Sequence, residues 1–115
     1  MEFQVIKGNQ IEEQGNEETK FQDLFNSDDL DISIAKVIRN SQDRTKGSDT
    51  ASNNFYYVLE GEGTCITEEK EIKLEKGDLI VIPKNTKYKN IGNLRLLAIS
   101  IPMFKKENQS YEGDA

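Results

Sequence analysis

Short apolar runs alternate with clusters of Gly, Asn and Asp along most of the chain, whereas helical periodicity is scarce. This pattern is typical of an all-β sandwich or barrel. Strands are predicted at residues 20–25, 32–38, 55–59, 64–67, 71–74, 79–82 and 94–101. We expect a single domain over residues 1–115 with its core at about 20–104, followed by a disordered polar tail at 105–115.

Two segments that contain glycine are predicted to be turns. Glu60–Gly63 lies between two predicted strands, and its glycines at 61 and 63 can supply the positive φ of a hairpin turn. Glu75–Asp78 precedes the run LIVI at 79–82. Because this run is apolar throughout, it predicts either burial on both faces or a wall between the interior and a partner.

Residues 39–54, RNSQDRTKGSDTASNN, contain almost no apolar side chain. A polar stretch of this length between strands is predicted to be a loop, either mobile or functional. This segment therefore supplies several of the candidate site residues considered below.

Composition and charge limit the partners and the cellular location that we expect for this chain. The 115 residues carry a formal net charge of −6, which disfavours nucleic acid and an anionic membrane surface as partners. The chain has no apolar run of membrane-spanning length and no secretory signal, so a cytoplasmic location is expected. Cys65 is the single cysteine and is predicted to be a buried core residue.

Residues 55–63 read FYYVLEGEG, and residues 77–83 read GDLIVIP. Both stretches resemble motifs of the cupin family. The resemblance implies a cupin double-stranded β-helix, which is a jelly-roll barrel, with a site inside the barrel. It also implies a homodimer, for which the short apolar segment Phe3–Ile6 is a candidate pairing strand.

Aligning the family motifs on Gly61 and Gly77 identifies the positions at which cupins usually carry metal ligands. The glutamate position falls on Asn54 and the second-motif histidine position on Tyr88. With a spacer of three residues, the two remaining histidine positions fall on Ser48 and Thr50; with four residues, they fall on Gly47 and Asp49.

The chain contains no histidine. Asp49 would be the only carboxylate at these positions, and one carboxylate is too little for a divalent transition metal. We therefore expect neither a metal nor another cofactor.

The residues at the former ligand positions are uncharged hydrogen-bonding groups. By the two-residue period of a strand, Tyr56 shares the inward face of Asn54. We therefore predict that a small polar molecule, sugar-like or a carboxylate, binds in the barrel. The predicted lining residues are Ser48, Thr50, Asn54, Tyr56 and Tyr88. The alternative is that these groups merely satisfy one another.

Three functions stay open at this point. The first is a metal-independent protein that binds the small molecule without catalysis. The second is an isomerase or lyase acting on a sugar or small organic acid, with Asp49 or Tyr88 as general acid or base. The third is a dimeric interaction protein whose pocket is vestigial.

Overall fold

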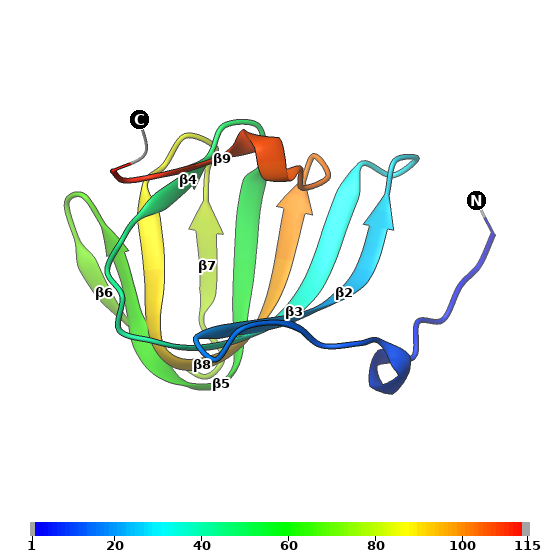
Figure 1. The fold of residues 1–115 in the computed structure, drawn as a ribbon, viewed down its shortest axis with the longest axis horizontal. Coiled ribbons are helices and arrows are strands. Elements are labelled where there is room, and N and C mark those ends of the chain that lie inside the picture. Colours follow the sequence, from blue (N-terminus) through cyan, green and yellow to red (C-terminus); the bar gives the residue numbers. More distant parts are fainter. Residues whose placement is uncertain (1, 114–115) are drawn as a thin grey trace.

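The computed structural model describes residues 2–113, and strands make up most of the fold (Figure 1). The strands are β1 (Gln14–Gly15), β2 (Thr19–Ser27), β3 (Ile32–Ser41), β4 (Gly47–Asp49), β5 (Asn53–Thr67), β6 (Glu71–Glu75), β7 (Leu79–Ile82), β8 (Tyr88–Ile101) and β9 (Gln109–Tyr111). Two 3-10 turns, η1 (Gly8–Gln10) and η2 (Lys106–Asn108), complete the elements. No helix in residues 2–113 is long and apolar enough to cross a membrane.

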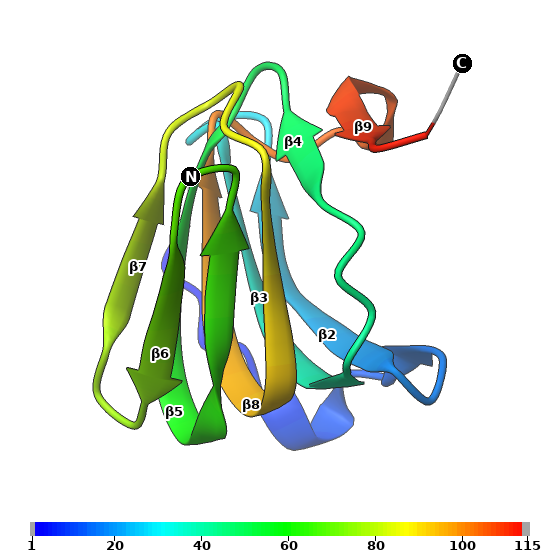
Figure 2. The same ribbon diagram turned by 90° about the vertical axis from the view of Figure 1, so that its left-hand side faces the viewer.

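The two longest strands, β5 and β8, pair antiparallel along nearly their whole length and curl the sheet upon itself (Figures 1 and 2). The first half of β5 pairs with β7 and its second half with β6. The second half of β8 pairs with β3, and its first residue pairs with β4. One continuous sheet thus forms both walls of a barrel, which confirms the predicted all-β jelly roll.

The core lies on the inner face of the curled sheet. Its buried members are Val58, Cys65, Leu74, Ile80, Ile82, Leu94 and Leu96. Cys65 is 3% exposed, which confirms its predicted place in the core. Burial raises the pKa of the Cys65 thiol, so at neutral pH this group is an uncharged core side chain rather than a nucleophile.

The segment Glu60–Gly63 is not the predicted hairpin turn, because β5 runs through it without a break. A register shift between Val58 and Glu60 marks a bulge at this point, where the strand bends. Gly61 has φ +94°, and a Cβ there would lie 2.0 Å from the backbone oxygen of Asn93 on β8. The glycine therefore permits a close approach of two strands.

Strand β7 is not buried on both faces. Ile80 and Ile82 point into the core, whereas Leu79 and Val81 are 61% and 55% exposed. The outer face of this strand consequently presents apolar side chains to solvent in the isolated chain.

The polar segment and the C-terminal tail pair with each other. β4 lies within the predicted loop at 39–54, and β9 lies where a disordered tail was expected. Their backbones pair antiparallel, with Ser48 opposite Ser110, above the open end of the barrel in Figure 1. Backbone pairing with β4 orders residues 109–111 even though they lack an apolar pattern.

Residues 2–7, which precede η1, have no regular secondary structure. Phe3, Val5 and Ile6 are 92%, 63% and 40% exposed, and the segment extends away from the barrel in Figure 1. The pairing of Phe3–Ile6 with a second copy stays a prediction.

Candidate functional site

Two tyrosines meet inside the barrel. Tyr56 comes from β5 and Tyr88 from the start of β8, and both pack against the buried core. Their hydroxyl groups are hydrogen-bonded to each other, and their ring centroids lie 5.9 Å apart at an interplanar angle of 53°. The structure therefore brings these two predicted site residues together.

The pair is held in its uncharged form at neutral pH. Burial raises the pKa of both phenols, and for Tyr88 the neighbouring Tyr56 raises the pKa further. Arg39 partly offsets these effects because its positive charge favours a phenolate. Both hydroxyl groups therefore act as hydrogen-bond donors and acceptors rather than as bases.

This shift predicts a loss of stability at alkaline pH. Unfolded tyrosines ionise near pH 10, whereas the folded pair keeps its protons to higher pH, so the free energy of unfolding should fall as the pH rises above about 10. The double variant Tyr56→Phe/Tyr88→Phe should show a shallower fall, measured by urea unfolding between pH 8 and pH 11.5. Tyr57→Phe on the outer face is the comparison, and equal slopes in the two variants would contradict the prediction.

Two further polar side chains reach the inner face, and sequence reasoning missed both. Arg39 on β3 pairs with the core residue Leu94, and its Nη1 donates to Thr19 Oγ1 at 2.6 Å. Asn90 on β8 follows Tyr88 by two residues, so the two share a face, and it is 2% exposed. The signal was present in the alternation of β8, but Asn90 belongs to no family motif.

Arg39 and Asn90 each carry a buried polar atom without a protein partner. These atoms are Nε of Arg39, a donor, and Oδ1 of Asn90, an acceptor. Buried polar atoms are normally hydrogen-bonded, and an exception calls for a water or a ligand. We name the set Arg39, Tyr56, Tyr88 and Asn90 the inner polar cluster.

The predicted residues of the β4 region divide between two faces. Gly47 is the register partner of Tyr88, so alternation places Asp49 on the inner side and turns Ser48 and Thr50 away from it. Thr50 is exposed, and its amide and hydroxyl both donate to the backbone oxygen of Asn108. The four-residue spacer thus describes the inward positions better than the three-residue spacer.

Asp49 is 2% exposed, and its carboxylate already has several partners. One oxygen accepts the backbone N–H groups of Ala51 and Ser52 at 3.0 and 2.8 Å, and the other accepts Gln109 Nε2 at 3.2 Å. The bond from Gln109 ties β4 to β9. The arrangement favours a structural role for a residue that the sequence offered as a catalytic candidate.

Asn54 lies on the inner face, as its two-residue spacing from Tyr56 predicted. It is 4% exposed, and its Oδ1 accepts a hydrogen bond from Ser100 Oγ at 2.5 Å. This bond joins β5 to β8, so the side-chain oxygen of Asn54 is already engaged within the protein.

The residues at the cupin ligand positions do not fit a transition metal. In residues 2–113 no group of three His, Cys, Asp or Glu side chains is arranged so that it could hold a metal ion. The Asp49 carboxylate already accepts hydrogen bonds from protein donors. The amide of Asn54, which is hydrogen-bonded to Ser100, and the phenol of Tyr88 are weak ligands for a transition metal ion. The chemistry available to the inner face is therefore hydrogen bonding, the positive charge of Arg39 and the carboxylate of Asp49, which protein donors already engage.

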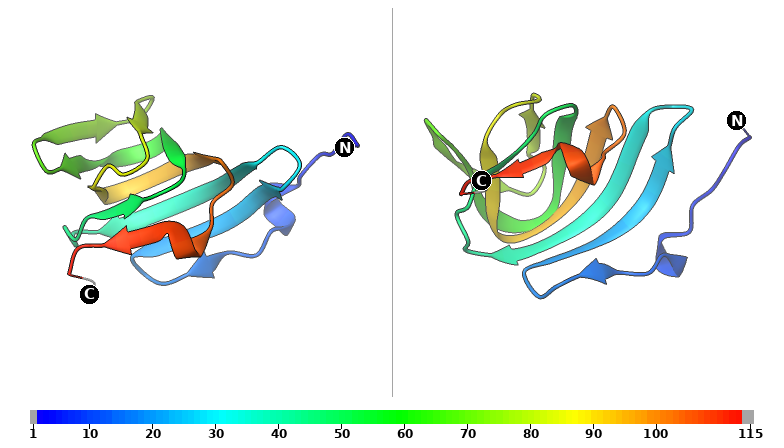
Figure 3. Two further views of the ribbon diagram at one scale, coloured as in Figure 1. Left: turned by 90° about the horizontal axis from the view of Figure 1, so that it is seen from above. Right: turned by 45° about the horizontal axis from the view of Figure 1, so that its top comes forward.

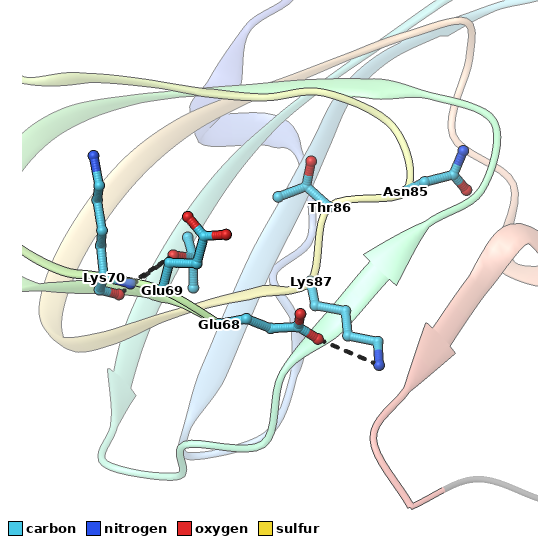
Figure 4. Close-up of a pocket in the computed structure, with 7 residues that line it drawn as sticks. Glu68, Glu69, Lys70, Asn85, Thr86 and Lys87 are labelled. Atoms are coloured by element: carbon cyan, nitrogen blue, oxygen red, sulfur yellow. Dashed lines mark hydrogen bonds and ion pairs between the residues drawn. The ribbon is translucent and has the colours of Figure 1, made fainter.

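An open hollow of about 550 Å³ lies at the rim of the barrel. It is lined by Thr67, Glu68, Glu69, Lys70, Asn85, Thr86 and Lys87, and Figure 4 shows the Glu68–Lys87 ion pair at 3.5 Å. Thr67 is the register partner of Tyr88, so this rim adjoins the tyrosine pair. Its acidic and basic side chains are exposed, and Glu68 and Lys87 among them form an ion pair.

Two comparisons bear on the family of the chain. The family model for the cupin domain matches residues 46–101. An uncharacterized protein of Methanocaldococcus jannaschii, MJ1618, is 39% identical over 61 residues. That match covers 50% of this chain and 49% of the relative, so it spans about half the length of each.

Solved structures share the fold at low sequence identity. Streptomyces Pac13 with uridine superposes with a TM-score of 0.84 at 17% identity, covering 96% of this chain and 91% of Pac13. Pac13 is described as a nucleoside dehydratase. Ectoine synthase from P. lautus has a TM-score of 0.81 at 13% identity, covering 95% of this chain and 89% of its own. The match to the cupin domain over residues 46–101 and the shared barrel show that this chain has the cupin fold, and its sequence contains none of the histidines that usually bind metal in cupins.

Proposed function

We propose that this cupin binds a small polar molecule inside the barrel without a metal. The observation that carries the proposal is the pair of buried, unpartnered atoms, Arg39 Nε and Asn90 Oδ1, on the same inner face as the tyrosine pair. A donor and an acceptor left open in a low-dielectric interior favour a ligand that offers the complementary groups.

The ligand class follows from the chemistry of the inner polar cluster. Arg39 Nε offers an N–H of a permanently charged group, which favours a carbonyl, carboxylate or phosphate oxygen. Asn90 Oδ1 requires an N–H or O–H donor. Sugar acids and nucleosides carry both kinds of group, and Pac13, which shares the fold, has been crystallised with uridine.

A thermal-shift screen tests the proposal. Uridine, sugars, sugar phosphates and carboxylic acids should be tried as probes, because a ligand of the folded state raises the melting temperature by mass action. At a concentration about 100 times its Kd, a true ligand should stabilise the fold by about 2.7 kcal/mol.

Variants locate the binding. Arg39→Gln and Asn90→Leu should each raise the Kd of the ligand at least tenfold. The stabilisation by the ligand at a fixed concentration should therefore fall by about 1.4 kcal/mol. Arg95→Gln is the matched control, since Arg95 lies exposed on the outer face of β8. Equal shifts in Arg39→Gln and Arg95→Gln would rule out the inner polar cluster as the site.

A lyase or isomerase acting on a sugar or small organic acid is a second candidate. The position of Tyr88 favours it, because its phenol lies on the inner face, hydrogen-bonded to Tyr56, where it can donate a proton to a leaving or rearranging oxygen. Turnover of a ligand from the screen, lost in Tyr88→Phe but kept in Tyr57→Phe, would support this function. Loss of turnover in Asp49→Asn together with normal folding would instead assign the chemistry to Asp49.

A further inference from the structure

A hollow of about 450 Å³ lies in the wall of the barrel, between β6 and β7. Within residues 2–113 each of these strands pairs with β5 alone, β7 with its first half and β6 with its second half. A tight turn joins them, in which the N–H of Asp78 donates to the oxygen of Glu75 at 3.1 Å. Figures 1 and 3 show that the two strands diverge from this turn, so the far end of β6 lies well away from β7.

The exposure of Ile72 shows that this hollow reaches the inner face of the sheet. Strand alternation places Ile72 on the same face as Leu74, and its register partner on β5 is Cys65. Leu74 and Cys65 are each 3% exposed, whereas Ile72 is 52% exposed. An inner-face side chain that is half open to solvent beside two closed ones marks a place where the core is uncovered.

Apolar side chains form most of the lining of the hollow. Cys65, Ile72 and Leu74 form one side, and all four residues of β7 form the other. The volume falls at the lower end of the range of about 300–1,000 Å³ that is typical of sites for small molecules. Because covering apolar surface is favourable in water, this lining favours an apolar occupant.

The charges at the hollow favour an occupant without charge. The lining carries two charged side chains of opposite sign, Lys73 and Asp78. The Asp78 carboxylate accepts the backbone N–H of Glu75 at 2.9 Å, so it is engaged within its own turn. Lys73 alternates with Ile72 and Leu74 along β6 and therefore points to the opposite face. A charged ligand on the apolar floor would lose hydration without gaining a partner among these residues, which costs free energy.

We propose that the hollow between β6 and β7 binds a small, uncharged, apolar molecule. The bound molecule covers Ile72 and completes the core where the two strands part. This site goes beyond the proposed function, because no member of the inner polar cluster lines it.

Fluorescence titration with N-phenyl-1-naphthylamine tests the site, because this uncharged aromatic probe brightens in apolar surroundings. The folded chain should bind the probe with a Kd below about 200 µM. Ile72→Gln removes an apolar side chain from the lining, and the exposure of this position lets it accept a polar replacement. The Kd should rise at least about fivefold, since the probe then loses the apolar area that it buries against this isoleucine. Circular dichroism checks that each variant keeps its strands.

Ile101→Gln is the matched control, because Ile101 is 44% exposed at the end of β8 and lies outside the lining. Its Kd should equal that of the wild type. A wild-type chain that binds no probe up to about 200 µM would overturn the proposal, and so would equal Kd values for the wild type and Ile72→Gln. A Kd that rises in Tyr57→Gln but not in Ile72→Gln would also overturn it, by placing the probe on the outer face of β5, where Tyr57 is 44% exposed.

Discussion

Replacing Leu96 by alanine is expected to lower the free energy of unfolding by about 3 kcal/mol, the largest effect of a single truncation in this core. Leu96 is 0% exposed and lies at the centre of β8, where Val37 of β3 and Val58 of β5 flank it. The variant removes three buried carbon atoms and leaves a cavity between strands that are pinned on both sides, so collapse around it is limited.

Such a loss is a large part of the 5–15 kcal/mol that stabilises a typical domain. Urea unfolding followed by circular dichroism measures it, and the melting temperature should fall by about 10 °C. Leu30→Ala is the control, since Leu30 lies in a turn and is 58% exposed, and it should cost less than about 0.5 kcal/mol. Similar losses for both variants would show that Leu96 is not the packing centre that the structure indicates.

Strand identity could be predicted because the apolar runs of this chain are short and well separated. The runs at 32–38, 71–74 and 79–82 correspond to β3, β6 and β7 with boundaries close to those observed. The inward placement of Asn54 and Tyr56 also followed from the two-residue period. These features depend only on local alternation, which a single sequence records directly.

Features that depend on long-range pairing could not be predicted. Positive φ at a glycine serves a turn or a bulge equally well, so Gly61 alone could not distinguish a hairpin from the bent β5. β9 forms by backbone pairing with β4, and its sequence has no apolar pattern that would predict a strand. The spacer before Asn54 allowed either Ser48 and Thr50 or Gly47 and Asp49 to face inward, and only the pairing of Gly47 with Tyr88 decides between them.

The two faces of the sheet explain why the candidate site was only partly foreseen. Arg39 on β3 and Asn90 on β8 occupy inward positions of their strands, but neither position belongs to a family motif, so the motifs did not point to them. The two-sided apolar character of β7 had two explanations, and the exposure of Leu79 and Val81 rules out burial on both faces.

Gly61→Ala is expected to destabilise the fold far more than Gly77→Ala, although both glycines belong to the resemblance that first indicated the family. Their φ angles are +94° and +93°, so an alanine carries the same backbone strain at either position, about 1 to 2 kcal/mol. At Gly77 a new Cβ meets no atom within 4 Å, whereas at Gly61 it would lie 2.0 Å from the oxygen of Asn93.

Backbone cannot yield as a flexible side chain does, so Gly61→Ala must part β5 from β8 at the bulge. We expect a total cost of about 4 kcal/mol for Gly61→Ala, against at most about 2 kcal/mol for Gly77→Ala. Urea unfolding of the two variants measures the difference directly. Because both variants carry the same backbone strain, any additional loss of unfolding free energy in Gly61→Ala measures the close approach of β5 and β8. Equal losses in the two variants would mean that the bulge relaxes freely and that the barrel does not depend on this contact.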